Sequence, residues 1–130
     1  MRYGRDEDQW DALVTEGRAF LEERARLQRL TNYSEVNDRL AKRTGQPPFD
    51  FTQDAERTAL GEVLGRITEE TFPQTKVMLS SLVVYINEND AGDGFYSLAQ
   101  RLGLLAHGAG PEARLDFWAT QVKAVYAFFG

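Results

Sequence analysis

Cysteine nucleophiles and thiolate metal sites are excluded in this chain because the sequence contains no cysteine, so its single histidine and its carboxylates are the candidates for catalysis. The histidine, His107, lies in the stretch AHGAG, where no serine or aspartate stands beside it to form a relay. Adjacent glutamates occur at 22–23 and at 69–70. Neighbours on a helix point about 100° apart, so neither pair can act as a carboxylate dyad on one helix face. We therefore expect no catalytic residues and no enzymatic activity.

A metal or cofactor site is the next chemistry to consider, and the acidic segment NENDAGDG at 87–94 is the candidate for calcium. Asn87, Asn89 and Asp93 do not have the ligand spacing of an EF-hand, and Asn, Asp and Gly are residues that tight turns require. The sequence also lacks an HExxH motif and a Gly-rich phosphate-binding loop. These patterns predict no metal and no cofactor.

Basic residues are concentrated in one part of a chain whose net charge is −5. An acidic protein does not coat nucleic acid through its overall charge. The segment 24–43, however, contains six basic residues against two acidic ones. This asymmetry fits either a binding face or two solvated helix surfaces. As a binding face it would contact bases through Tyr33 or Asn37, and phosphates through Arg24, Arg26, Arg29, Arg39, Lys42 and Arg43.

Helices are predicted to carry most of these residues. Apolar residues at helical spacing indicate an amphipathic helix over about 8–30. Capping residues and breakers then place four more helices, which begin near Asn32, Thr52 or Asp54, Ser97 and Pro111. The third helix contains Gly61 and Gly65, each costing about 1 kcal/mol relative to alanine, which predicts close approach of another backbone there.

A β-hairpin is predicted at 79–98, between the third helix and the short helix that follows. An apolar, β-branched run favours a strand, residues 87–94 supply a turn, and an aromatic restart reads as the second strand. The predicted fold is a single α+β, mostly α domain over 1–130. It comprises an N-terminal helix at 1–30, a winged-helix-like core of three helices and one hairpin at 31–105, and a C-terminal helix at 106–130.

Residues 31–105 resemble the DNA-binding winged-helix domain of the alkylguanine alkyltransferase and alkyltransferase-like family. The matching stretches are TNYSEVNDRLA, ALGEVL, LVV and GFYSLAQRLGLL. Tyr33 matches the family's helix-opening tyrosine, 59–61 its recognition-helix core, and 83–84 its Val-Val strand. The resemblance implies a winged-helix fold that binds DNA.

The sequence departs from that family at the residues that carry its chemistry. The Pro-Cys-His-Arg motif is missing, and alkyl transfer requires a thiolate nucleophile, so this activity is excluded. The arginine that the family places before the recognition-helix triplet falls on Thr58 here. Base extrusion by an arginine finger is therefore not expected.

The acidic recognition helix and the acidic hairpin tip argue against ordinary winged-helix docking on phosphates. We expect a non-catalytic accessory or regulatory module of a DNA-handling system that binds nucleic acid weakly through the basic segment 24–43, alone or as a homodimer. The alternative is a protein-interaction or assembly module, such as an inhibitor or regulator of a partner protein. Its contacts would be Glu62, Arg66, Glu69, Glu88, Asp90 and Asp93.

The compartment and the absence of a membrane partner are expectations from hydropathy. No segment approaches the roughly 18 apolar residues of a transmembrane helix, and the first residues lack the apolar region of a signal peptide. The sequence therefore predicts a cytoplasmic protein whose partner is DNA or another protein.

Overall fold

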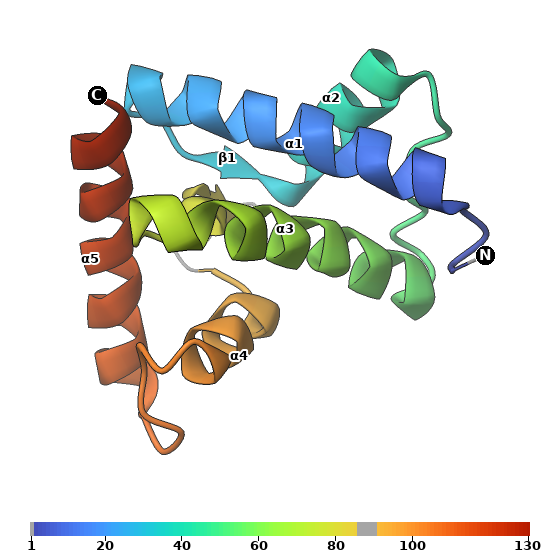
Figure 1. Ribbon diagram of the computed structural model, residues 1–130. Helices are drawn as coiled ribbons and strands as arrows, with labels where there is room; N and C mark the ends of the chain where they lie inside the picture. The colour runs from blue at the N-terminus through green and yellow to red at the C-terminus, as the bar shows by residue number, and fades with distance from the viewer. Residues whose placement is uncertain (1, 86–90) are drawn as a thin grey trace.

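A computed structural model describes residues 2–85 and 91–130 of the chain, and Figure 1 shows their arrangement. The described residues are mostly helical, with a small two-stranded sheet. The elements in chain order are α1 (Glu7–Leu27), β1 (Thr31–Asn32), α2 (Tyr33–Thr44), α3 (Asp54–Thr75), the 3-10 helix η1 (Leu79–Leu82), β2 (Val83–Val84), α4 (Asp93–Arg101) and α5 (Pro111–Phe129). No helix in these described ranges has the length and apolar character needed to cross a bilayer.

Helix α1 packs along α3 and α2, so that three helices enclose the larger part of the core (Figure 1). A capping box between Asp6 and Gln9 starts α1, and Gln28 ends it in a left-handed conformation. The buried stripe of α1 includes the fully buried Trp10 and Phe20. The sequence prediction of this amphipathic helix is confirmed, with an end three residues earlier than expected.

The predicted hairpin is wrong, because its two halves form different structures. Residues 79–82 form η1, and the strand that follows, β2, pairs in parallel with β1 rather than with a neighbouring strand. The residues read as the second strand belong to helix α4. Phe95, Leu98 and Ala99 have the spacing of one helix face, and they are buried against Trp118 of α5 in a second, smaller core. The turn itself lies partly at 86–90, outside the described residues.

Helix α5 stands across one end of the α1–α3 layer and is fixed there by two hydrogen bonds to η1 and the residue before it (Figure 1). The indole Nε1 of Trp118 donates to the backbone carbonyl of Ser81 at 2.8 Å, and the backbone N–H of Met78 donates to Gln121 Oε1 at 2.9 Å. These bonds satisfy backbone groups of a segment that is buried throughout and has almost no sheet partner.

The Ser81 hydroxyl provides a test of this packing, because it is fully buried and has no hydrogen-bond partner in the described chain. We expect Ser81→Ala to leave the free energy of unfolding unchanged or to raise it by up to about 1 kcal/mol, since an unsatisfied polar group is removed. The matched control is Ser80→Ala, which deletes the hydroxyl that accepts from the Thr68 O–H at 2.8 Å, leaves the bond from the Ser80 N–H to Thr68 in place, and should cost about 1 kcal/mol. Equal losses in urea denaturation of both variants would contradict this account.

Candidate functional site

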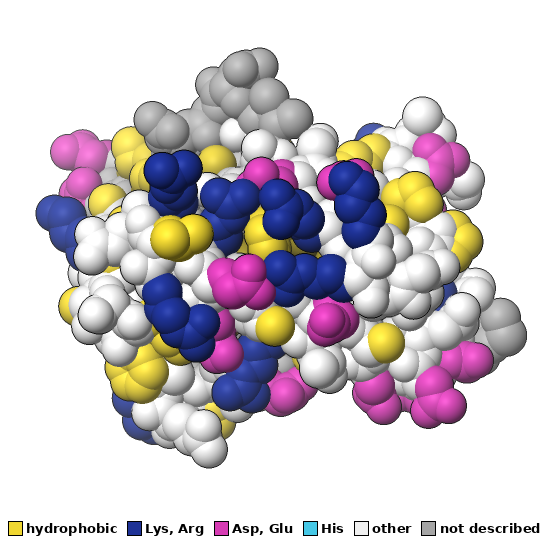
Figure 2. All heavy atoms as spheres, turned by 90° about the horizontal axis from the view of Figure 1, so that it is seen from above, with side chains coloured by type: hydrophobic (Ala, Val, Ile, Leu, Met, Phe, Trp, Pro, Cys, Tyr) yellow, Lys and Arg dark blue, Asp and Glu magenta, His cyan; other side chains and the backbone are white. Residues whose placement is uncertain are grey.

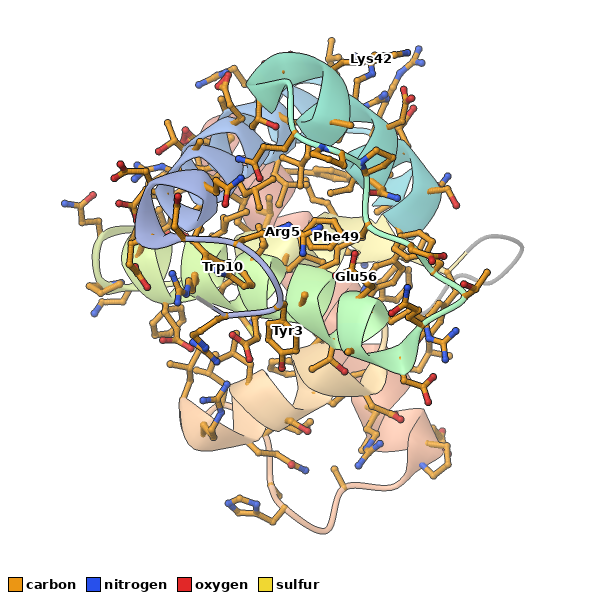
Figure 3. The ribbon with its side chains drawn as sticks, turned by 90° about the vertical axis from the view of Figure 1, so that its right-hand side faces the viewer. Tyr3, Arg5, Trp10, Lys42, Phe49 and Glu56 are labelled. Carbon is orange, nitrogen blue, oxygen red and sulfur yellow. The ribbon has the colours of Figure 1, made fainter. Side chains whose placement is uncertain are left out.

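The basic residues predicted from the sequence gather on the outer face of α1 and α2 (Figure 2). Phe20, itself buried, lies at the centre of this face. The guanidinium groups of Arg24, Arg39 and Arg43 lie 5.2, 5.6 and 5.5 Å from the centre of its ring. We call Arg24, Arg39 and Arg43 the arginine cluster, and the exposed Arg26 on α1 is close enough for its charge to act on Glu23 beside it. Lys42 is exposed on α2, where Figure 3 labels it, and the exposed Arg29 follows the end of α1.

Carboxylates neutralise half of the six predicted cations. Arg43 donates two hydrogen bonds to Glu23, at 2.9 and 3.0 Å, and Arg24 pairs with Glu35 at 2.9 Å. Lys42 pairs with Asp38 at 3.0 Å. In the described ranges, Arg26, Arg29 and Arg39 have no ion pair.

Glu23 is a component of this face that the sequence interpretation missed, because it stands one residue outside the segment 24–43. The hydrogen bonds from Arg43 lower the pKa of the Glu23 carboxyl, and the nearby charges of Arg26 and Arg39 add to the effect. The spacing of Glu23 from Arg43, twenty residues along the chain, carries no local signal that could have found the pair. The net positive charge of the face is therefore smaller than the sequence count of the segment suggests.

Neither residue predicted to contact bases joins the arginine cluster. The side chain of Asn37 donates to the carbonyl of Phe49 at 2.9 Å and accepts from its N–H at 2.7 Å, which ties the loop before α3 to α2. The ring of Tyr33 lies 5.2 Å from that of Tyr85 and lines a groove on another side of the molecule.

This groove has a volume of about 1190 Å³ and runs between α3, the start of α2 and one side of α4. We call it the α3–α4 groove. Gly61 and Gly65 line it, and a Cβ atom built at either glycine would have no neighbour within 4 Å. No segment among the described residues approaches these glycines, so the predicted close approach of another backbone is not made within residues 2–85 and 91–130. Gly92 is the opposite case, since a Cβ there would lie 2.8 Å from the hydroxyls of Tyr33 and Tyr85.

Four of the six residues predicted for protein interaction line the α3–α4 groove, namely Glu62, Arg66, Glu69 and Asp93. Glu62 accepts a hydrogen bond from Arg2 at 2.9 Å, Arg66 lies over the ring of Trp10, and Glu69 faces Arg101 at 3.7 Å. Arg57, also in the groove, is bonded to Asp54. The other two predicted residues, Glu88 and Asp90, lie outside the described residues. Opposite charges are therefore balanced along the groove.

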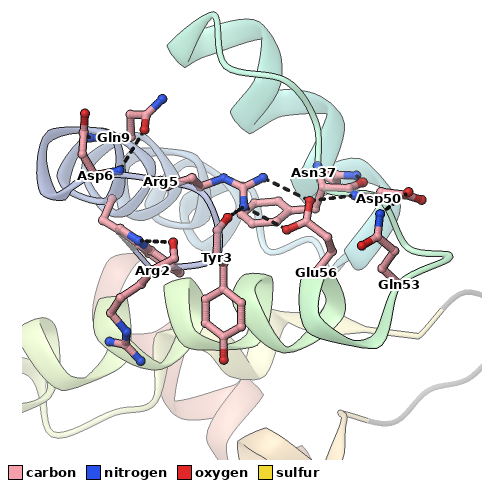
Figure 4. Close-up of polar contacts among 11 residues, drawn as sticks. Arg2, Tyr3, Arg5, Asp6, Gln9, Asn37, Asp50, Gln53 and Glu56 are labelled. Carbon is pink, nitrogen blue, oxygen red and sulfur yellow. Dashed lines mark hydrogen bonds and ion pairs between the residues drawn. The ribbon is translucent and has the colours of Figure 1, made fainter.

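A buried ion pair lies beneath the start of α1, and the sequence interpretation missed it (Figures 3 and 4). Arg5 donates to Glu56 at 2.9 and 3.3 Å and to the carbonyl of Tyr3 at 3.0 Å, while its guanidinium stacks 4.0 Å from the centre of the Phe49 ring. The bonds from Arg5 lower the pKa of the Glu56 carboxyl. Every polar contact here is internal, so the pair holds the N-terminal segment to α3 rather than facing a ligand.

The remaining chemical candidates are not assembled into a site. His107 is exposed in the loop between α4 and α5. In the part of the chain that the structure describes, no three His, Asp or Glu side chains are grouped as metal ligands. No family model matches this chain, and neither curated proteins nor solved structures include a significant match to it.

Proposed function

We propose that the chain is a non-catalytic module that binds the phosphate backbone of nucleic acid weakly, through the outer face of α1 and α2. The observation that supports the proposal is the arginine cluster around Phe20, together with the absence of an ion pair for Arg26, Arg29 and Arg39 within the described ranges. Guanidinium groups form paired hydrogen bonds with phosphate, and an apolar ring beneath them keeps their charge at the surface.

The proposed binding does not depend on sequence, because the polar groups suited to base reading are used elsewhere. Asn37 is engaged with Phe49, and Tyr33 lines the α3–α4 groove. The contact also differs from winged-helix docking: it uses α1 and α2 instead of α3, whose first turn is acidic. The proposal that this module is an accessory of DNA handling therefore rests only on the order of its helices, which resembles that of a winged helix.

The salt dependence of binding to a random-sequence duplex tests this proposal. Three unpaired arginines predict that log K falls against log salt concentration with a slope of about −3, from roughly 0.9 per neutralised phosphate. Arg39→Glu should weaken binding about tenfold and make the slope shallower by about 1. Fluorescence anisotropy between about 50 and 200 mM salt measures both quantities.

The matched control is Lys123→Glu, which changes the net charge equally at an exposed position of α5. It should retain the affinity and slope of the unsubstituted chain. Equal weakening by Arg39→Glu and Lys123→Glu would show a response to net charge alone and contradict the arginine cluster as the binding face. Absence of binding at the lowest salt concentration would remove the nucleic-acid function.

The second candidate function is protein interaction, and the α3–α4 groove favours it. The groove brings together four of the predicted contact residues with the rings of Tyr33 and Tyr85, and its floor is open. Mixed charge with exposed aromatic surface is typical of protein interfaces.

A further inference from the structure

A row of four residues on α3 has a charge pattern that complements itself. Arg57, Gly61, Gly65 and Glu69 follow one another at four-residue spacing, and all four line the α3–α4 groove. Residues at this spacing form one ridge along a helix surface. The ridge is cationic at its first position, has no side chains at its middle two, and is anionic at its last.

We propose that the α3–α4 groove receives a second copy of this chain, with α3 of one copy crossing α3 of the other in antiparallel orientation. If the crossing point lies midway between Gly61 and Gly65, the two glycines of one copy face those of the other. The same two-fold operation places Arg57 of each copy opposite Glu69 of the other, so the pair forms twice. This proposal stands independently of nucleic-acid binding.

The dimensions of two crossing helices agree with this pairing. Positions 57 and 69 are each six residues from the midpoint, which is about 9 Å along the helix axis at 1.5 Å per residue. Ridges at four-residue spacing interdigitate at crossing angles near −50° with axes about 8–10 Å apart, and glycines at the crossing favour the shorter distance. Arginine and glutamate side chains are long enough to meet across the resulting separation.

The open space over Gly61 and Gly65 is the evidence that no segment among residues 2–85 and 91–130 covers the ridge. A glycine inside a helix costs about 1 kcal/mol relative to alanine, and neither glycine is in contact with another segment that needs the missing side chain. Next to them, Tyr85 is 46% exposed and offers apolar surface at the groove wall. A helix from a second copy would cover the open space over the two glycines and the exposed surface of Tyr85.

Charge selects a second copy over an anionic ligand for this groove. Three cations, Arg57, Arg66 and Arg101, are matched there by three carboxylates, so a phosphate or nucleotide would meet as much repulsion as attraction; the carboxylates are Glu62, Glu69 and Asp93. The present partners of the two end residues do not oppose dimer formation. The side chains of Arg57 and Glu69 are 55% and 52% exposed, and exchanging exposed ion pairs changes the free energy little.

Charge reversal at the two ends of the ridge tests the proposal by sedimentation velocity over a range of concentrations. Arg57→Glu alone and Glu69→Arg alone each replace two attractive contacts with two repulsive ones, so each should weaken self-association at least about tenfold. The double variant R57E/E69R restores opposite charges and should recover the affinity of the unsubstituted chain. The two single variants, mixed, should associate with each other although each is monomeric alone.

A steric variant and a binding control separate this surface from the arginine cluster. Gly61→Gln places a side chain into open space, so the monomer should keep its circular dichroism spectrum while losing self-association. Arg57→Glu, like Lys123→Glu, should leave duplex binding unchanged. A chain that remains monomeric up to about 1 mM, where association contributes only about 4 kcal/mol, overturns the proposal, as does a double variant that does not recover. Monomeric behaviour would assign the groove to a different protein.

Discussion

Arg5→Met is expected to lower the free energy of unfolding at pH 7 by about 3 kcal/mol, a large part of the stability of a small domain. The Arg5 and Glu56 side chains are only 10% and 18% exposed, so the substitution leaves a carboxylate with little access to water. It also removes the hydrogen bond to the Tyr3 carbonyl and the stacking on Phe49. Urea denaturation followed by circular dichroism measures the change.

The control for Arg5→Met is Arg2→Met, the same substitution in an exposed ion pair. Arg2 pairs with Glu62 at 2.9 Å, but the two side chains are 53% and 30% exposed, so the expected loss is at most about 1 kcal/mol. Comparable losses in the two variants would show that the buried Arg5–Glu56 pair contributes no more to the free energy of unfolding than an exposed ion pair does.

The stability conferred by Glu56 should depend on pH in a direction set by its lowered pKa. The unfolded carboxyl titrates near 4.5 and the folded one below it, so the contribution is complete above that value and is lost as the pH falls through the folded pKa. Arg5→Met removes the largest cause of this depression, and the hydrogen bond from the Asp50 backbone N–H is the one that remains to lower the pKa. The difference in unfolding free energy between the two proteins should therefore shrink from pH 7 to about pH 3.

Local patterns were sufficient to predict the long helices. Periodic apolar residues and caps identified α1, α2, α3 and α5, because each buries one stripe whose spacing is visible within the element. The two short strands escaped prediction since β2 pairs with β1, about fifty residues earlier, and no local pattern encodes that pairing. In α4, four residues such as 95–98 are too few to distinguish a helix period from a strand period.

For the candidate surfaces too, the sequence shows which residues are present, but not the contacts between residues that are far apart in the chain. The six cations of the basic face are visible in the sequence, whereas the neutralisation of Arg43 depends on Glu23, which reaches it only after α1 and α2 pack. The Arg5–Glu56 pair joins residues 51 positions apart, so its strength is a property of the fold alone. For the same reason, the sequence shows that some glycines lie inside helices, but it does not show which of them are covered by other segments of the fold.

Gly17 is a covered glycine and Gly61 is an open one. Substitution by leucine should therefore have opposite effects on the free energy of unfolding at the two positions. A Cβ atom at Gly17 would lie 2.8 Å from Ile67 Cδ1 and 3.5 Å from Leu40 Cδ2, both in fully buried side chains. Gly17→Leu must displace the buried Ile67 and Leu40 side chains and should cost about 3 kcal/mol or more. A Cβ atom at Gly61 meets nothing within 4 Å among the described residues, so Gly61→Leu should stabilise the monomer by about 0.5–1 kcal/mol through helix propensity.

Thermal and urea unfolding of the two leucine variants at low protein concentration, where the chain is monomeric, measure this contrast. A loss of stability at Gly61 comparable with that at Gly17 would mean that the α3–α4 groove is closed in the folded monomer. The result expected from the open floor is a variant more stable than the original chain but unable to self-associate. That combination would show that Gly61 lowers the stability of the monomer and permits a contact between copies. The requirements of folding alone do not explain a glycine at this position.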